Sequence, residues 1–155
     1  MKELKDLFKR HFTKELEGSD NTVYDLFEWQ NVDVNLTNYQ TGATILSMED
    51  LEFPVDYSQN ACNIIASKYF RRRGIPNGLG YEHSMREVAD RMVGFWADAL
   101  KEEGIIETEE EWQIFYDEMV YALLKQMWAP NSPQWFNTGL ARSYDIKGDK
   151  DDLYY

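Results

Sequence analysis

The hydrophobic residues near the N-terminus recur at the three- and four-residue intervals that place side chains on one face of a helix. This pattern predicts a helix over residues 3–16, which Gly18 would end. The residues that carry the pattern are Leu4, Leu7, Phe8 and Phe12.

Between residues 27 and 53 the pattern changes to short runs in which hydrophobic and polar residues alternate. Alternation with a period of two is typical of a strand with one buried face. We therefore predict two strands, or a hairpin, with Gly42 in the connection and Pro54 at the end. The hydrophobic residues of the two runs are Trp29, Val32, Val34 and Leu36, and then those between Ala43 and Met48.

Three longer amphipathic segments follow, and they supply most of the predicted core. The first is predicted to run from a cap at Ser58 to about Arg72, and the second covers residues 83–103. The third begins with a capping box formed by Thr108 and Glu111. The side chains expected to face the core are Ala61, Ile64, Ile65 and Tyr69 in the first helix, Val88, Met92, Phe95, Trp96 and Leu100 in the second, and Trp112, Phe115, Met119, Leu123 and Met127 in the third.

Residues 129–140 read APNSPQWFNTGL and combine a polar turn, bounded by prolines, with a short apolar run. The prolines stop the helical pattern before them, and we expect the apolar run to form a buried strand that closes at Gly139. Such a turn would present the Ser132 hydroxyl and nearby backbone N–H groups to an anion. Alternatively, Ser132 only caps and terminates a helix. The local pattern leaves both interpretations open.

The composition is that of a single globular domain. The chain has 155 residues, of which 43% are hydrophobic and 15% aromatic, enough to build a core. Its 16 basic and 28 acidic residues give a net charge of −12, which argues against binding to nucleic acid or to an anionic membrane. The first residues include acidic ones and form no apolar stretch, and no apolar run reaches 18 residues. The sequence therefore predicts neither a signal peptide nor a membrane span.

The single cysteine, Cys62, lies within a predicted helix, where we expect it to act as a small buried hydrophobic residue. A chain with one cysteine forms no internal disulfide, and this is typical of a reducing cytoplasm. The two histidines, His11 and His83, are far apart in sequence, and neither belongs to a Glu-x-x-His pair. We therefore expect no zinc or di-iron site.

Two charged clusters remain as candidates for binding. The acidic cluster, within residues 107–118, is either a solvated helix N-terminus, which the helix dipole favours, or a metal or partner site. The basic cluster would hold a phosphate or an acidic partner surface. Alternatively, its cations lie at a helix C-terminus and pair with Glu87 or Asp90. The basic cluster consists of Lys68, Arg71, Arg72 and Arg73, together with Arg86 and Arg91 on the next helix.

Five blocks of this sequence match one enzyme family in the same order. They are YDLFEW at 24–29, FPVDYSQNA at 53–61, IIASKYFR at 64–71, the spaced residues Glu82, Ser84, Arg86, Asp90 and Arg91, and APNSPQWFNTGL at 129–140. Together they resemble the N-terminal region of class II, adenosylcobalamin-dependent ribonucleotide reductases, over about residues 24–140. Arg72 and Arg73 depart from the family pattern, which usually has a glycine soon after the first arginine.

The resemblance implies a mostly α fold, with a helical N-terminal domain over residues 1–128 that contains a small β-hairpin. Residues 129–155 would begin the catalytic α/β barrel with its first strand. The family converts ribonucleotides to deoxyribonucleotides for DNA synthesis, using a thiyl radical on a barrel cysteine. Homolysis of the cobalt–carbon bond of adenosylcobalamin generates that radical, and a cysteine pair with a glutamate completes the reduction. These groups and the cofactor belong to the barrel, so this chain has no catalytic residues of its own and needs the barrel polypeptide as a partner.

Two substrate-binding residues follow from the resemblance. Ser132 matches the hydroxyl residue before proline that contacts the phosphate end of the ribonucleotide. Asn131 belongs to the same motif, but it could equally cap the turn. The rival interpretation of the whole chain is a stand-alone acidic, helical protein-binding module that kept the fold without catalysis.

Overall fold

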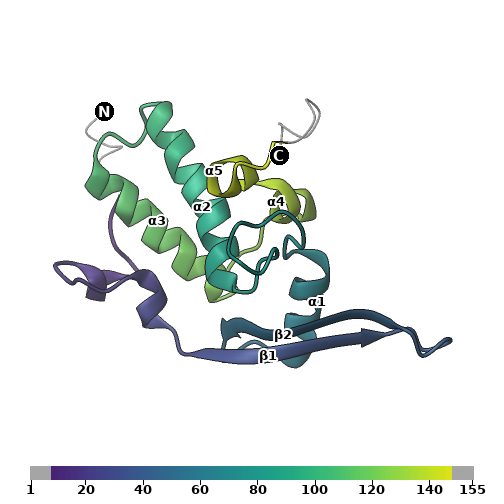
Figure 1. Ribbon diagram of the computed structural model, residues 1–155. Coiled ribbons are helices and arrows are strands. Elements are labelled where there is room, and N and C mark those ends of the chain that lie inside the picture. The colour runs from purple at the N-terminus through teal and green to yellow at the C-terminus, as the bar shows by residue number, and fades with distance from the viewer. Residues whose placement is uncertain (1–7, 148–155) are drawn as a thin grey trace.

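The computed structural model describes residues 8–147. Helical segments lie together on one side of a two-stranded antiparallel sheet, with α2 and α3 side by side (Figure 1). This confirms the predicted mostly α fold with a small N-terminal hairpin. The elements are the 3-10 helices η1 (Lys14–Leu16) and η2 (Val23–Leu26), the strands β1 (Trp29–Thr37) and β2 (Thr44–Pro54), and the helices α1 (Gln59–Lys68), α2 (Met85–Glu102), α3 (Glu109–Leu124), α4 (Ser132–Asn137) and α5 (Leu140–Tyr144).

The hairpin forms as predicted, and it projects beyond the helical body (Figure 1). β1 pairs with β2 in an antiparallel register that begins with Trp29 opposite Pro54. Gly42 lies in the connection with a φ of +69°, a backbone conformation that glycine adopts without steric cost. Val32 and Val34 alternate with exposed residues along β1, so one face of the ribbon packs on the core.

The helix predicted over residues 3–16 is wrong in its described part. Residues 8–13 are not helical and only η1 remains, while residues 3–7 lie outside the described residues. The backbone N–H groups of residues 11–13 donate to the Glu118 carboxylate at 2.9 to 3.2 Å, and the Thr13 hydroxyl donates to it at 2.7 Å. These N–H groups bond to α3 instead of to carbonyls one helical turn earlier, so the local periodicity does not become a helix.

Helix α1 begins where the sequence predicts but ends earlier. The Ser58 hydroxyl accepts a hydrogen bond from the N–H three residues on, at 3.1 Å, and caps the helix as expected. The helix ends at Lys68 instead of about Arg72. The N–H of Arg71 donates to the buried carboxylate of Glu82 at 2.8 Å, so it makes no helical bond.

The limits of α2 and α3 lie close to the predicted ones. Ser84 and Glu87 form a capping box at the start of α2, and Gly104 follows its end with a φ of +76°. Thr108 caps α3 as predicted. In a capping box the Glu111 carboxylate would accept from the backbone N–H of Thr108. Here it accepts instead from the Thr108 hydroxyl at 3.2 Å, so only the first bond of the predicted capping box forms.

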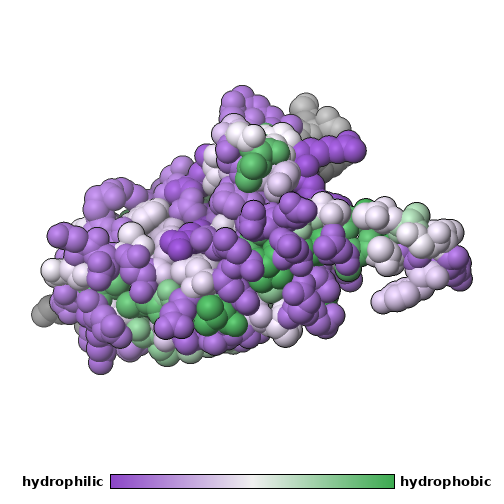
Figure 2. Space-filling model, turned by 60° about the horizontal axis from the view of Figure 1, so that its bottom comes forward, coloured by the Kyte–Doolittle hydropathy of each residue, from purple (hydrophilic) through white to green (hydrophobic). Residues whose placement is uncertain are grey.

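The core is built largely from the predicted helices, but some of their faces are turned. Ile64 and Phe95 are each 41% exposed and Met127 is 54% exposed, although all three were expected in the core. The buried residues of α1 are Cys62 and Ala66. Met127 lies beyond the end of α3, where the helical spacing no longer applies. The face shown in Figure 2 is largely hydrophilic with hydrophobic residues in separate areas, in keeping with the acidic composition.

The strand expected in the apolar run before Gly139 is not found, because these residues are helical. The side chain of Asn131 caps α4 by accepting from the N–H of Gln134. Pro133 fits in the first turn of α4, since an N–H at that position has no partner within the helix. Trp135 becomes buried, and the segment lies against α2 (Figure 1). The predicted domain boundary after residue 128 stays a prediction.

Candidate functional site

The two predicted substrate-binding residues lie at the start of α4. The Asn131 side-chain oxygen accepts the Gln134 N–H at 3.3 Å, so it serves as the helix cap. Ser132 is exposed, and its Oγ lies 3.3 Å from the hydroxyl oxygen of Tyr69 at the end of α1. The structure therefore separates the two: Asn131 stabilises the turn, whereas the Ser132 hydroxyl faces the surface beside Tyr69.

Aromatic rings join α4 to the end of α1. The ring of Tyr69 stacks on Trp135 at a centroid distance of 5.0 Å and lies 5.6 Å from the ring of Phe136. The indole N–H of Trp135 donates to the carbonyl oxygen of Pro130 at 2.9 Å. Tyr69 was predicted as a core residue of its helix, and the pattern gave no sign of this contact with the Ser132 turn.

A buried ion pair holds the same segment from the other side. The guanidinium of Arg91 donates to both carboxylate oxygens of Glu82 at 3.0 Å, and both side chains are fully buried. It also donates to the carbonyl oxygens of Trp135 at 3.0 Å and Thr138 at 2.8 Å. Arg91 thus connects α2 directly to the backbone of α4.

Tyr144 of α5 completes this network by donating to the Glu82 carboxylate at 2.7 Å. Burial, and then the adjacent carboxylate, raise the pKa of Tyr144 well above its usual range, so it stays a donor. Between α4 and α5, Gly139 has a φ of +81°, and a Cβ there would overlap the carbonyl oxygen of Arg91. Only glycine permits this close approach.

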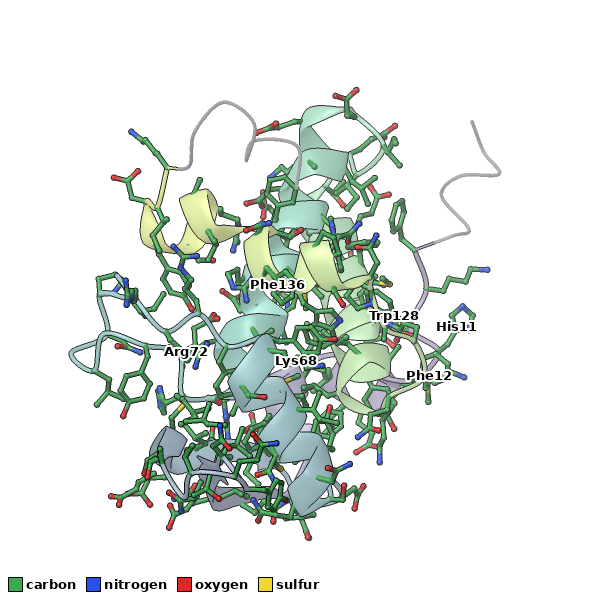
Figure 3. All side chains as sticks on the ribbon, turned by 90° about the vertical axis from the view of Figure 1, so that its right-hand side faces the viewer. His11, Phe12, Lys68, Arg72, Trp128 and Phe136 are labelled. Carbon is green, nitrogen blue, oxygen red and sulfur yellow. The ribbon has the colours of Figure 1, made fainter. Side chains whose placement is uncertain are left out.

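An open cavity of about 600 Å³ lies between the chain leaving α1 and the exposed ring of α4. Figure 3 shows Lys68, Arg72 and Phe136 on this face of the molecule, where Lys68 comes from α1 and Phe136 from α4. The cavity is lined by Lys68, Tyr69, Phe70, Arg71, Arg72, Arg73 and Phe136.

The predicted basic cluster is therefore smaller than the sequence suggested. Arg86 does not join it, because its Nε donates to the Glu52 carboxylate at 2.8 Å and its guanidinium lies 4.3 Å from the Trp29 ring centroid. Arg91 is buried on Glu82. Neither arginine forms an ion pair with Glu87 or Asp90 among the described residues. The remaining four cations all line the cavity.

The acidic cluster is not wholly the solvated helix N-terminus that the helix dipole would favour. Asp117 is only 3% exposed and accepts from the guanidinium of Arg10 at 2.7 Å. Glu118 binds the backbone of residues 11–13. These two carboxylates therefore fix the N-terminal segment on α3.

A chain of partly buried hydroxyl groups has no local signal in the sequence. The Tyr24 and Tyr116 hydroxyl oxygens lie 2.6 Å apart, and Tyr116 donates to the Asp90 carboxylate at 2.6 Å. Burial raises the pKa of both tyrosines well above the usual range. The resemblance blocks contain Tyr24 and Asp90, but the bonds join residues far apart in sequence, which no local pattern signals.

Cys62 is fully buried, as predicted for a small hydrophobic residue, and burial raises its pKa to about 11. Within residues 8–147, no group of three or more His, Cys, Asp or Glu side chains could hold a metal ion. No helix in that part of the chain is long and apolar enough to cross a membrane.

Comparison with known proteins gives consistent matches over most of the chain. The profile of the family described as class II vitamin B12-dependent ribonucleotide reductase matches residues 31–126. The vitamin B12-dependent ribonucleotide reductase of Streptomyces avermitilis is 39% identical over 79% of this chain and 13% of its own length. The proteins of the same name from Agrobacterium fabrum and Bradyrhizobium diazoefficiens are each 32% identical, over 95% and 82% of this chain. The chain spans only 13–14% of the length of these three relatives.

Proposed function

The chain belongs to the class II vitamin B12-dependent ribonucleotide reductase family, and we propose that it forms the N-terminal part of such an enzyme. The family match over residues 31–126 carries this proposal. The complete enzyme would convert ribonucleotides to deoxyribonucleotides by radical chemistry for DNA synthesis. This chain has one cysteine, which is buried, so the radical and redox cysteines would come from the barrel polypeptide. Residues 129–155 would lead into that barrel, and we place the enzyme in the cytoplasm.

Adenosylcobalamin would be bound by the barrel and not by this chain. The cofactor is a large corrin macrocycle with an adenosyl group, and the cavity of about 600 Å³ is an open hollow with neither histidine nor cysteine in its lining. Cys62 lies in the core, away from any surface that a cofactor could reach. These residues do not fit the cofactor, and we assign them no part in its chemistry.

The contribution of this chain to the reaction would be to position the substrate. The Ser132 hydroxyl is exposed at a turn that is held by the Tyr69 contact and by the Arg91 network. A hydroxyl fixed in this way donates a hydrogen bond to a phosphate oxygen without first losing rotational freedom. Asn131 would act indirectly, because its side chain caps the helix that carries Ser132.

The first test is an affinity pull-down with the tagged chain from its native cell lysate, assayed for ribonucleotide reduction with and without added adenosylcobalamin. Recovery of a cysteine-rich partner and cobalamin-dependent activity would support the proposal. A chain that recovers an unrelated partner, or none, and no activity would instead be a stand-alone binding module.

The substrate contact has its own test in the assembled enzyme. Ser132→Ala should raise the KM for the ribonucleotide by the value of one charge-assisted hydrogen bond, about 1.5 to 3 kcal/mol, which is roughly 10- to 150-fold. Ser47→Ala, at an exposed serine of β2, serves as the control and should leave KM unchanged. An unaltered KM in the Ser132 variant would remove this residue from the site.

A further inference from the structure

The arginines of this chain divide into two groups. Four of the seven pair with a carboxylate, namely Arg10 with Asp117, Arg86 with Glu52, Arg91 with Glu82, and Arg142 with Asp98. The other three are Arg71, Arg72 and Arg73, and all of them line the open cavity beside Lys68.

These three arginines form no ion pair with any residue in the described part of the chain. Acidic partners are abundant, since the chain has 28 acidic against 16 basic residues. Arg72 and Arg73 are exposed, so their guanidinium groups are accessible to a ligand in the cavity. The cavity therefore presents positive charge that no carboxylate of the described residues neutralises, and charge-assisted hydrogen bonds to an anion would do so.

One wall of the cavity is aromatic. Phe136 is 40% exposed, and its ring lies 5.6 Å from the ring of Tyr69, which also lines the cavity. An exposed ring next to a set of guanidinium groups suits a ligand that has both a planar apolar part and several negative charges. The volume of about 600 Å³ lies within the range of small-molecule sites.

We propose that this cavity binds a nucleoside polyphosphate, with its phosphates on Arg71, Arg72 and Arg73 and its base against Phe136. The choice of a nucleotide rests on the proposed function, whereas the need for a polyanion rests on the unpaired arginines. The cavity adjoins the proposed substrate contact, because the Tyr69 hydroxyl oxygen lies 3.3 Å from the Ser132 Oγ.

The test is calorimetric titration of the 155-residue chain with ADP at low ionic strength, where interactions between exposed charges are strong. Arg72→Gln combined with Arg73→Gln should weaken ADP binding by at least about 100-fold, which is roughly tenfold for each guanidinium removed. Both side chains are exposed, so the variant should fold, as far-UV circular dichroism will show. Lys14→Gln with Lys147→Gln removes the same charge at exposed sites outside the cavity and should leave binding unchanged.

A second variant tests recognition of the base. Phe136→Ala should weaken ADP binding by about tenfold while leaving the affinity for inorganic pyrophosphate unaltered. Adenosine, which has no phosphate, should not bind measurably. Equal weakening of ADP and pyrophosphate binding in this variant would overturn the assignment of the base.

Equal ADP affinity in the wild type and the double arginine variant would overturn the site. Binding of an octaglutamate peptide without binding of ADP would also overturn it, in favour of an acidic partner surface. These results are independent of the reductase assay. Arginine-dependent ADP binding without reductase activity in the pull-down would reject only the proposed function. Reductase activity in the pull-down without arginine-dependent ADP binding would reject only this site.

Discussion

Replacing Arg91 with methionine tests the buried network that fixes the Ser132 segment. The guanidinium makes two hydrogen bonds to the Glu82 carboxylate and two to backbone carbonyl oxygens of Trp135 and Thr138, all between 2.8 and 3.0 Å. Methionine fills much of the same volume but donates none of these bonds. Two carbonyl groups and a buried carboxylate would then be left without their main donor.

The expected decrease in unfolding free energy is large for a single substitution. Removing one partner of a buried ion pair costs about 3 to 5 kcal/mol, because the other charge stays buried and uncompensated. Glu82 keeps two donors, the Arg71 N–H at 2.8 Å and the Tyr144 hydroxyl at 2.7 Å, so we expect the lower end of this range. Small domains are stable by only about 5 to 15 kcal/mol, and the change should therefore be measured easily.

Urea denaturation followed by circular dichroism gives the comparison. Arg142→Met is the matched control, because Arg142 pairs with Asp98 at 2.5 Å but both side chains are partly exposed. Loss of such an exposed pair should lower the free energy of unfolding by no more than about 1 kcal/mol. Replacing Glu82 as well as Arg91 with methionine should recover part of the stability, since no charge is then left buried. If the free energy of unfolding of the Arg91→Met variant lies within about 1 kcal/mol of the wild-type value, the network does not hold the segment.

Three further substitutions or reagents test the structure at other points. Burial raises the pKa of Glu118, but the hydrogen bonds from the Thr13 hydroxyl and from the backbone of residues 11–13 outweigh this effect and hold the pKa below its usual value. The free energy of unfolding should therefore decrease as the pH falls through the pKa of this carboxyl group, and Glu118→Gln should flatten this dependence in thermal melts. Cys62 should not react with a disulfide reagent at pH 8 until the chain is unfolded, because it is buried and its pKa is about 11; reaction at the rate of a free thiol would contradict this. Gly139→Ala should lower the free energy of unfolding clearly more than Gly42→Ala. Both glycines have a positive φ, but only at Gly139 would a Cβ lie against backbone atoms. Equal unfolding free energies of the two variants would contradict the close approach.

The parts of the fold that the sequence predicts are those with local causes. The hairpin follows from alternation and Gly42, and the start of α3 follows from the capping residue Thr108. The predictions are wrong for segments whose backbone bonds go to distant side chains. Glu118 takes the N–H groups of residues 11–13 from across more than 100 residues of sequence, and Glu82 ends α1 by taking the N–H of Arg71.

The candidate site was predicted only in outline for the same reason. The motif around Ser132 identified the turn, but its apolar run is too short to distinguish a strand from a helix by periodicity alone. The side chain of Asn131 and Pro133 decide the outcome in favour of a helix. The contact with Tyr69 and the bonds from Arg91 join elements distant in sequence, so only the folded chain brings them together.

The position of α4 connects the two proposed ligand contacts physically. Its first residue, Ser132, offers the hydroxyl, and Phe136 of the same helix forms the aromatic wall of the cavity. Trp135 lies between them in the chain, and it is fixed by the Tyr69 ring and by the Arg91 guanidinium. Any displacement of α4 would therefore move both contacts together. Loosening Arg91 should thus weaken nucleotide binding at the cavity even though Arg91 does not line it, whereas a substitution of Gly42 in the exposed hairpin connection should not.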